Sequence, residues 1–229
     1  MFPLSASMVF GVPLEKKYSA LGVDFRSATE GWTTVDVGLE EPLLIEQRSD
    51  VLGGVVWDCA RVACGLLGKL PEIVEGRFPE GTRVLELGCG TGVVGLACAG
   101  RGASVLCTDQ SPELATTNAR GKLRVQKFLW GETSLQENFH IVVGSDCLYD
   151  PKALPSLLKT LLALTTQDTV LYIAYKRRRD DTEAPFFKAL ETHFEHVAFT
   201  HPNNIAPPYD NKGLYLCRIA HKRSIIDER

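Results

Sequence analysis

The feature that most constrains the fold is a glycine-rich turn near the middle of the chain. Residues 84–92, V-L-E-L-G-C-G-T-G, place an apolar run directly before three glycines at alternate positions, and a second apolar segment follows. Glycine tolerates a positive φ and lets the backbone come close to a ligand. In open parallel α/β sheets, ligands bind at the carboxyl ends of strands, at turns of this kind. The segment therefore predicts an α/β fold with a ligand site at residues 88–92.

The rest of the chain alternates predicted strands with predicted helices. Strands are expected at 84–87, 104–108, 125–129, 140–145, 169–175, 196–200 and 213–220, and helices at 54–70, 93–100, 151–165 and 183–194. A further helix is expected to begin with Ser111 as its N-cap and Pro112 as its first residue. This alternation predicts a doubly wound, mostly parallel, seven-stranded Rossmann-like sheet with helices on both faces.

Composition and length indicate one main domain. The chain has 229 residues and a formal charge of −3, from 25 Lys and Arg against 28 Asp and Glu. A domain built to bind nucleic acid is usually basic, so this balance argues against that class. We expect an N-terminal extension at 1–52 with short strands at 32–37 and 43–47, a catalytic domain at 53–222 and a charged tail at 223–229.

The cysteines and the hydropathy pattern predict the compartment. The chain has seven cysteines, an odd number, and none of them forms a C-x-x-C pair. This pattern is typical of free thiols in a reducing compartment and of a chain without a metal site. The first residues lack a basic segment, and no run reaches the 18 or so apolar residues of a membrane span. We therefore expect a protein of the cytoplasm, and of the nucleus as well, that does not enter a membrane.

Two cofactor classes compete for the glycine turn. Residues 90–95 match the dinucleotide pattern G-x-G-x-x-G, but the match begins two residues after the strand has ended. The register that begins at Gly88, with Glu86 before it, instead resembles motif I of the class I S-adenosylmethionine-dependent methyltransferases. Asp109 closes the next strand, 21 residues after Gly88. An acid at that place accepts hydrogen bonds from ribose hydroxyls in either cofactor class, so it does not choose between them.

Five short motifs in order favour the second class. They are G-V-V-W-D at 54–58, L-E-L-G-C-G-T-G at 85–92, Asp109, L-W-G at 129–131 and D-C-L-Y at 146–149. Together they resemble the seven-β-strand protein methyltransferases, which act mostly on lysine side chains of chaperones, AAA ATPases and translation factors. Tyr175 to Arg178 is similar to the family's Y-x-x-R. The region around Tyr209 and residues 214–219 is similar to the branch that methylates valosin-containing protein.

The resemblance implies S-adenosylmethionine as the cofactor and a role for individual residues. The backbone of the glycine turn would contact the methionine part, and Asp109 would hold the ribose. Trp130 would stack on the adenine, and Trp57 would cover the methionine end. Each tryptophan could instead serve only in packing. The implied cofactor-binding residues are Trp57, Glu86, Gly88, Cys89, Gly90, Asp109, Trp130 and Ser145.

Methyl transfer to lysine needs a neutral amine, although the lysine side chain has a pKa near 10.4 in water. Burial in a narrow channel lowers that pKa, and an oxygen acceptor then orients the amine. Asp146 and Tyr149 follow the predicted fourth strand, and we expect them to do this as catalytic residues. They could instead be a strand-end cap and a packing tyrosine. The implied partner is a protein substrate, and the chain is expected to be a monomer.

One spacing departs from the family. Only 20 residues separate Asp109 from Trp130, which predicts a short helix and a tight return through Gly121.

Four further functions are compatible with the sequence. A nucleic-acid methylase would carry N/D-P-P-Y after the fourth strand, whereas Pro207-Pro208-Tyr209 comes after the fifth. The basic run at 176–179 is offset by two aspartates that follow it. A small-molecule methyltransferase, a non-catalytic binding module and a dehydrogenase could also be built on such a sheet, because one fold serves many functions.

Overall fold

The computed structural model describes residues 8–9, 12–13, 31–132, 135–178, 180–200 and 213–223. The prolines and Tyr209 at 207–209 lie outside the described residues, as does half of the N-terminal extension. Two very short strands, β1 (Met8–Val9) and β2 (Val12–Pro13), pair antiparallel in that extension.

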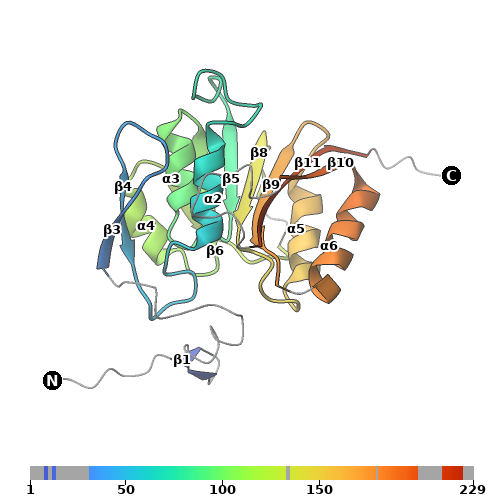
Figure 1. Cartoon of the computed structure of the whole chain (residues 1–229), viewed down its shortest axis with the longest axis horizontal. Coiled ribbons are helices and arrows are strands. Elements are labelled where there is room, and N and C mark those ends of the chain that lie inside the picture. Colours follow the sequence, from blue (N-terminus) through green and yellow to red (C-terminus); the bar gives the residue numbers. More distant parts are fainter. Residues whose placement is uncertain are drawn as a thin grey trace.

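Within the described residues, one seven-stranded sheet forms the centre of the fold, in the order β10-β11-β9-β8-β5-β6-β7 (Figure 1). The five neighbouring strands β9, β8, β5, β6 and β7 run parallel to one another. β11 pairs antiparallel with both β9 and β10. The bounds are β5 (Arg83–Leu87), β6 (Ser104–Asp109), β7 (Arg124–Lys127), β8 (Ile141–Ser145), β9 (Val170–Lys176), β10 (Phe194–Thr200) and β11 (Leu214–Lys222). The mostly parallel seven-stranded sheet predicted from the sequence is confirmed.

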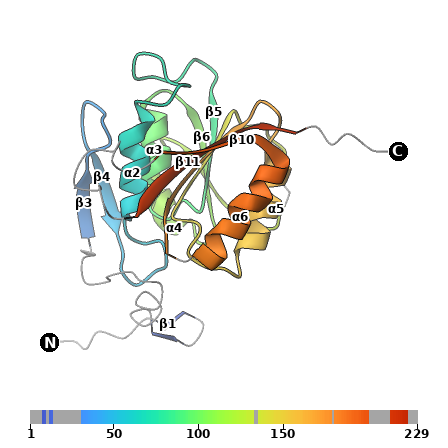
Figure 2. The same cartoon turned by 45° about the vertical axis from the view of Figure 1, so that its right-hand side comes forward.

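Helices cover both faces of this sheet (Figure 2). The helices are α2 (Asp58–Leu67), α3 (Val93–Gly100), α4 (Glu113–Ala119), α5 (Leu154–Leu164) and α6 (Asp180–His193). The first three pack on one face and the last two on the other, and each face has its own apolar core. Successive strand residues such as Val84 and Leu85 point to opposite faces, so one buried strand supplies both cores.

The order of the strands creates a switch point beside β5. The chain leaves β5 toward β6 and β7, then returns to place β8 on the other side of β5. Loops that follow β5 and β8 therefore diverge at the carboxyl edge of the sheet, which is where open α/β sheets bind ligands. The glycine turn follows β5, and the D-C-L-Y segment follows β8.

A hairpin of β3 (Gly31–Val35) and β4 (Leu43–Gln47) lies against the α3 and α4 side. Its inward side chains Val35 and Ile45 join the core of that face. The buried amide of Asn118 on α4 bonds both the N–H of Glu46, at 2.7 Å, and its carbonyl, at 3.1 Å. The same amide donates to the carbonyl of Thr91 at 3.0 Å. One side chain thus links the hairpin to the glycine turn.

Two local expectations were wrong. The helix predicted at 54–70 begins only at Asp58, because Gly54 is held in a turn by hydrogen bonds to Arg48 and Val51. Ser111 is not the N-cap of α4; Pro112 is, and the Ser111 N–H donates to Asp109 instead. The short helix and tight return through Gly121 are confirmed, since α4 has seven residues and ends at left-handed Arg120 and Gly121.

We expect Asn118→Ala to lower the free energy of unfolding by about 2–3 kcal/mol. Three backbone groups lose a hydrogen-bond partner at a buried position, and each such loss costs about 1 kcal/mol or more. Urea denaturation measures this. The control is Thr117→Ala on the exposed side of α4, which should change stability by less than about 0.5 kcal/mol. Equal losses in the two variants would contradict the bridging role of Asn118.

Candidate functional site

The glycine turn is held in a shape that only glycine supports well. Gly88, Gly90 and Gly92 have φ values of 63°, 51° and 77°. A Cβ on Gly88 would lie 3.0 Å from the Trp130 ring and 3.2 Å from the Cys147 sulfur. A Cβ on Gly90 would lie 2.6 Å from the Gly53 carbonyl oxygen. The turn is therefore packed closely by three other segments of the chain.

The segment before α2 forms one wall of the site. Gly53 has a φ of 78° and approaches Gly90 so closely that a side chain on either residue would clash. Four residues later, Trp57 is the half-buried N-cap of α2. The chain thus enters α2 across the glycine turn. The predicted contact of Trp57 with a cofactor stays a prediction.

Asp109 lies at the end of β6, beside the turn. Its Oδ2 accepts the Gly90 N–H at 2.9 Å, and its Oδ1 accepts the Ser111 N–H at 2.9 Å. Burial raises the pKa of this carboxyl group, and the backbone hydrogen bonds partly oppose the rise. Gln110 also donates a backbone hydrogen bond to this carboxyl group. The two carboxylate oxygens have about four acceptor positions, so one remains for a ligand.

Trp130 comes to the turn from the other side. Trp130 lies in a short turn in which the Leu129 N–H donates to the carboxylate of Glu132. The next residue, Gly131, donates its N–H to the buried hydroxyl of Thr160 on α5 at 2.7 Å. Gly131 has a φ of 100°. This hydrogen bond fixes the turn to α5, so the Trp130 ring lies against Gly88 despite the short connection from Asp109.

The turn after β8 brings the acidic residue of the D-C-L-Y segment to the same edge. Asp146 has a φ of 55°, in the left-handed region, and its N–H donates to the Ala174 carbonyl at 2.8 Å. Ser145 is half-buried at the end of β8. Non-glycine residues with a left-handed backbone, such as Asp146, cluster at functional sites, because only a well-packed surrounding structure holds them in that conformation.

The Asp146 carboxylate makes a two-pronged ion pair with Arg178. Nη1 and Nη2 of Arg178 lie 2.7 Å and 3.0 Å from the two carboxylate oxygens. The side chains of Arg178 and Asp146 are only 13% and 11% exposed, respectively. No role was predicted for Arg178 from the sequence, although the Y-x-x-R spacing places an arginine beside the strand that neighbours Asp146.

Tyr149 is half-buried in this turn. Burial raises the pKa of its phenol, and the nearby acidic groups Cys147, Asp109, Asp150 and Asp146 add to the rise. The phenol is therefore neutral at physiological pH and keeps its proton as a hydrogen-bond donor. Its expected contact with a substrate stays a prediction.

Glu86 lies beneath the turn rather than on its ligand side. The side chain is 1% exposed, and its Oε2 accepts the Gly95 N–H at 2.8 Å and the Cys107 thiol at 3.1 Å. Burial raises its pKa from 4.5 to about 7. Glu86 thus braces the start of α3, and any effect on a cofactor passes through the turn.

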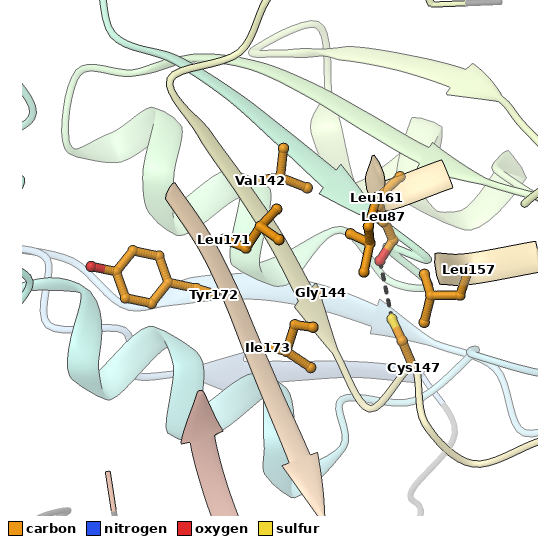
Figure 3. Close-up of a pocket in the computed structure, with 9 residues that line it drawn as sticks. All are labelled: Leu87, Val142, Gly144, Cys147, Leu157, Leu161, Leu171, Tyr172 and Ile173. Carbon is orange, nitrogen blue, oxygen red and sulfur yellow. Dashed lines mark hydrogen bonds between the residues drawn. The ribbon is translucent and has the colours of Figure 1, made fainter. Parts of the chain in front are cut away.

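Cys147 connects the two strand ends from below. Its thiol donates to the Leu87 carbonyl at 3.3 Å, at the edge of a small apolar void lined by residues of β5, β8, β9 and α5 (Figure 3). The seven cysteines are all free and buried, so the predicted free thiols are confirmed.

The structure therefore brings most of the predicted site residues to one edge of the sheet. The glycine turn, Asp109, Trp130 and the Ser145–Asp146 turn surround one region, and Cys89 contributes its backbone there while its side chain is buried. Glu86 is the exception, because its carboxylate faces α3. No helix among the described residues is long and apolar enough to cross a membrane.

Comparison with known proteins identifies similar chains. A family model described as lysine methyltransferase matches residues 40–193. Protein N-lysine methyltransferase METTL21A of Danio rerio is 34% identical over 147 residues, which cover 58% of this chain and 64% of that protein. The EEF1A lysine methyltransferase 3 of Mus musculus is 32% identical over 145 residues, which cover 59% and 60%. The matches thus span less than two thirds of these relatives.

Solved structures share the fold. A TehB-like SAM-dependent methyltransferase from Corynebacterium glutamicum has a TM-score of 0.55 at 16% identity, over 74% of this chain and 90% of that one. A Burkholderia thailandensis N1-methyltransferase with bound S-adenosylhomocysteine has a TM-score of 0.54 at 19% identity, over 73% and 79%. At these identities the likeness shows the fold alone.

We expect Glu86→Gln to change how stability depends on pH. The folded pKa of about 7 exceeds the ordinary 4.5, so the unfolded chain loses its proton first as pH rises. Between about pH 4.5 and 7 the wild type therefore loses roughly 3 kcal/mol of stability that the glutamine variant keeps. Denaturant unfolding at pH 4.5 and 8 tests this, with exposed Glu113→Gln as the control. A difference between wild type and Glu86→Gln that does not vary with pH would contradict the assignment.

We expect Thr160→Val to loosen the turn that carries Trp130. The valine keeps the shape of threonine but removes the acceptor for the Gly131 N–H, at a cost of about 1 kcal/mol. With Trp32 and Trp57 replaced by phenylalanine, Trp130 is the single tryptophan, and its emission should shift to longer wavelength. Thr160→Ser keeps the hydroxyl and should retain the original emission. An unchanged spectrum in the valine variant would show that Thr160 does not hold the turn.

Proposed function

Because the chain belongs to the lysine methyltransferase family, we propose that it transfers a methyl group from S-adenosylmethionine to a lysine side chain of a protein substrate. The observation that carries the proposal is the arrangement at the switch point. A glycine turn with an acid and a tryptophan beside it adjoins a second acidic turn, one strand away. The first group suits a nucleoside cofactor, and the second lies where an acceptor would meet it.

The residues present fit S-adenosylmethionine. Positive φ values at Gly88 and Gly90 leave no Cβ between the backbone and a ligand. Asp109 keeps an acceptor position for a ribose hydroxyl. The Trp130 ring would offer an apolar face to the adenine, and Trp57 would cover the methionine end.

When bound, S-adenosylmethionine supplies a methyl carbon that is activated by its attachment to a sulfonium. The lysine nitrogen would form the new N–C bond while the S–C bond breaks and its electron pair stays on sulfur. The amine must lose its ammonium proton to solvent before this step. Asp146 would accept a hydrogen bond from the neutral amine, and Tyr149 would line the approach. Holding the nitrogen about 3–3.5 Å from the methyl carbon is the main contribution of these residues.

The names of relatives support a class of substrate. The mouse relative is named for the lysine methylation of EEF1A. We therefore place translation factors first among the substrates, with chaperones and AAA ATPases as further candidates. We further propose that the chain acts as a monomer in the cytoplasm and nucleus. The seven free buried cysteines support a reducing compartment.

The test is transfer of labelled methyl groups from S-adenosylmethionine into a cell lysate by wild type and Asp109→Ala. We expect a protease-sensitive band that the variant does not label. Loss of the carboxylate removes both the ribose acceptor and the Gly90 hydrogen bond, and should weaken S-adenosylhomocysteine binding about 10- to 100-fold.

Asp168→Ala is the matched control, because Asp168 is exposed at the opposite edge of the sheet, before β9. It should label the band as the wild type does. Nuclease-sensitive label would instead favour a nucleic-acid methyltransferase. If the protein binds S-adenosylhomocysteine but labels no protein in lysates depleted of endogenous methylation, the result would favour a non-catalytic module.

A further inference from the structure

The ion pair between Asp146 and Arg178 differs from the surface ion pairs of the molecule. Arg48–Asp50 and Arg124–Glu137 have side chains that are between 41% and 57% exposed. The two partners at the site are 11% and 13% exposed and meet through two parallel hydrogen bonds. Water therefore screens this pair much less, and its geometry is better defined.

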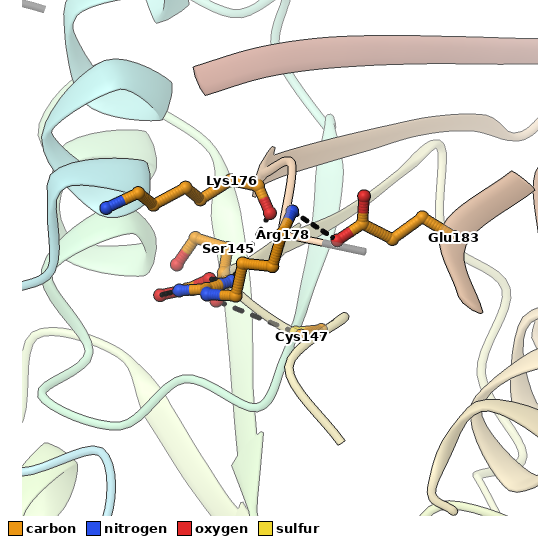
Figure 4. Close-up of polar contacts among 6 residues, drawn as sticks. Ser145, Cys147, Lys176, Arg178 and Glu183 are labelled. Atoms are coloured by element: carbon orange, nitrogen blue, oxygen red, sulfur yellow. Dashed lines mark hydrogen bonds and ion pairs between the residues drawn. The ribbon is translucent and has the colours of Figure 1, made fainter. Parts of the chain in front are cut away.

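Arg178 is itself held in place from two elements. Its backbone N–H donates to Oε1 of Glu183 on α6 at 2.9 Å, and its Nη1 also lies 3.4 Å from the Lys176 carbonyl oxygen. Figure 4 shows the guanidinium turned from the end of β9 toward the turn after β8. The arginine is thus fixed before any substrate arrives.

The surroundings of the pair are rich in acidic groups. The titratable groups that interact with the pair are Cys59 from α2, Cys147 and Tyr149 from the turn after β8 and Glu183 from α6. Asp58, Asp109 and Asp150 act on Cys59, Cys147 or Tyr149, and Lys176 on β9 contacts Arg178 through its carbonyl oxygen. Burial raises the pKa of Cys59, Cys147 and Tyr149, so these three are neutral at physiological pH. Arg178 is the cation in direct contact with Asp146.

A bare carboxylate at this place would work against methyl transfer. A negative charge within about 4–6 Å of an amine favours its ammonium form and raises its pKa by one unit or more. The ammonium has no lone pair and does not react. A carboxylate whose charge is offset by a guanidinium still offers an acceptor lone pair, because Arg178 occupies one position on each oxygen and the Cys59 thiol takes one more of the four.

We infer that Arg178 is a positioning residue that keeps the acceptor lysine reactive, because it neutralises Asp146 while leaving it able to orient the amine. Arg178 does not touch the reacting atoms; it acts through Asp146. This inference rests on the proposed function and adds the means by which the site favours the neutral amine.

The experiment measures initial rates of label transfer from S-adenosylmethionine into the protease-sensitive lysate band between pH 6.5 and 9.5. In Arg178→Met we expect the rising limb of the profile to move up by about one pH unit. The rate should then be about tenfold lower at pH 7.5 and approach that of the wild type near pH 9.5. Arg178→Lys keeps the positive charge and should restore most of the wild-type profile.

Arg218→Met is the matched control. Arg218 lies on the neighbouring strand β11, away from the carboxyl edge of the parallel strands, and forms an ion pair with Glu72 at 2.7 Å. Its loss should leave the pH profile unchanged. Binding of S-adenosylhomocysteine, measured separately, should change less than about twofold in Arg178→Met, because the pair does not hold the cofactor.

A second variant guards against a folding defect caused by the unpaired buried charge. Asp146→Asn combined with Arg178→Met removes both charges of the pair, so its net charge is that of the wild type and the variant should keep the wild-type pH profile at a lower rate. A loss of activity in Arg178→Met that is equal at all pH values, or a shifted profile in the double variant, would overturn the inference. A wild type that labels no protein would instead overturn the proposed function.

Discussion

The site depends on the close packing of three backbone segments around one glycine turn. Gly90 lies so close to the Gly53 backbone that there is no room for a Cβ, and Gly88 lies against the Trp130 ring and the Cys147 sulfur, where a Cβ would have to push these side chains aside. This packing brings the entry to α2, the turn after β7 and the turn after β8 to the same place. Ligand-facing groups can therefore come from segments that are far apart in the chain. A side chain at either glycine would separate the walls of the site as well as strain the turn.

Two acidic residues, Glu86 and Asp109, support this turn from different sides, and their surroundings give them different roles. Glu86 bonds the start of α3 from below, and burial raises its pKa to about 7, so that it gains and loses its proton around neutral pH. Asp109 bonds Gly90 from the side and keeps an acceptor position open at the edge of the sheet. A carboxyl group thus serves as an internal brace in one place and as a ligand acceptor in the other.

Much of this arrangement could be predicted from the sequence, because it follows from periodicity and glycine placement. The strands near β5, β6, β8 and β9 and the short helix before Gly121 fall within two residues of their predicted positions. The predicted start of α2 and the predicted N-cap of α4 were wrong. Hydrogen bonds hold Gly54 in a turn before α2, and the Ser111 N–H donates to Asp109 instead of capping α4. The direction of the Glu86 side chain and the pairing of Arg178 with Asp146 depend on which strands become neighbours. Local pattern does not determine that.

Placing β9 beside β8 has a consequence for chemistry as well as for packing. It brings Arg178 within 2.7 Å of Asp146, which lies 32 residues earlier in the chain. A carboxylate in the left-handed turn after β8 is held in place only if its charge is offset at this depth, because an unpaired buried charge is costly. The cation that stabilises the turn also sets the electrostatic potential at the place where an amine would approach. The stability of the fold and the protonation of the acceptor are therefore linked through one ion pair.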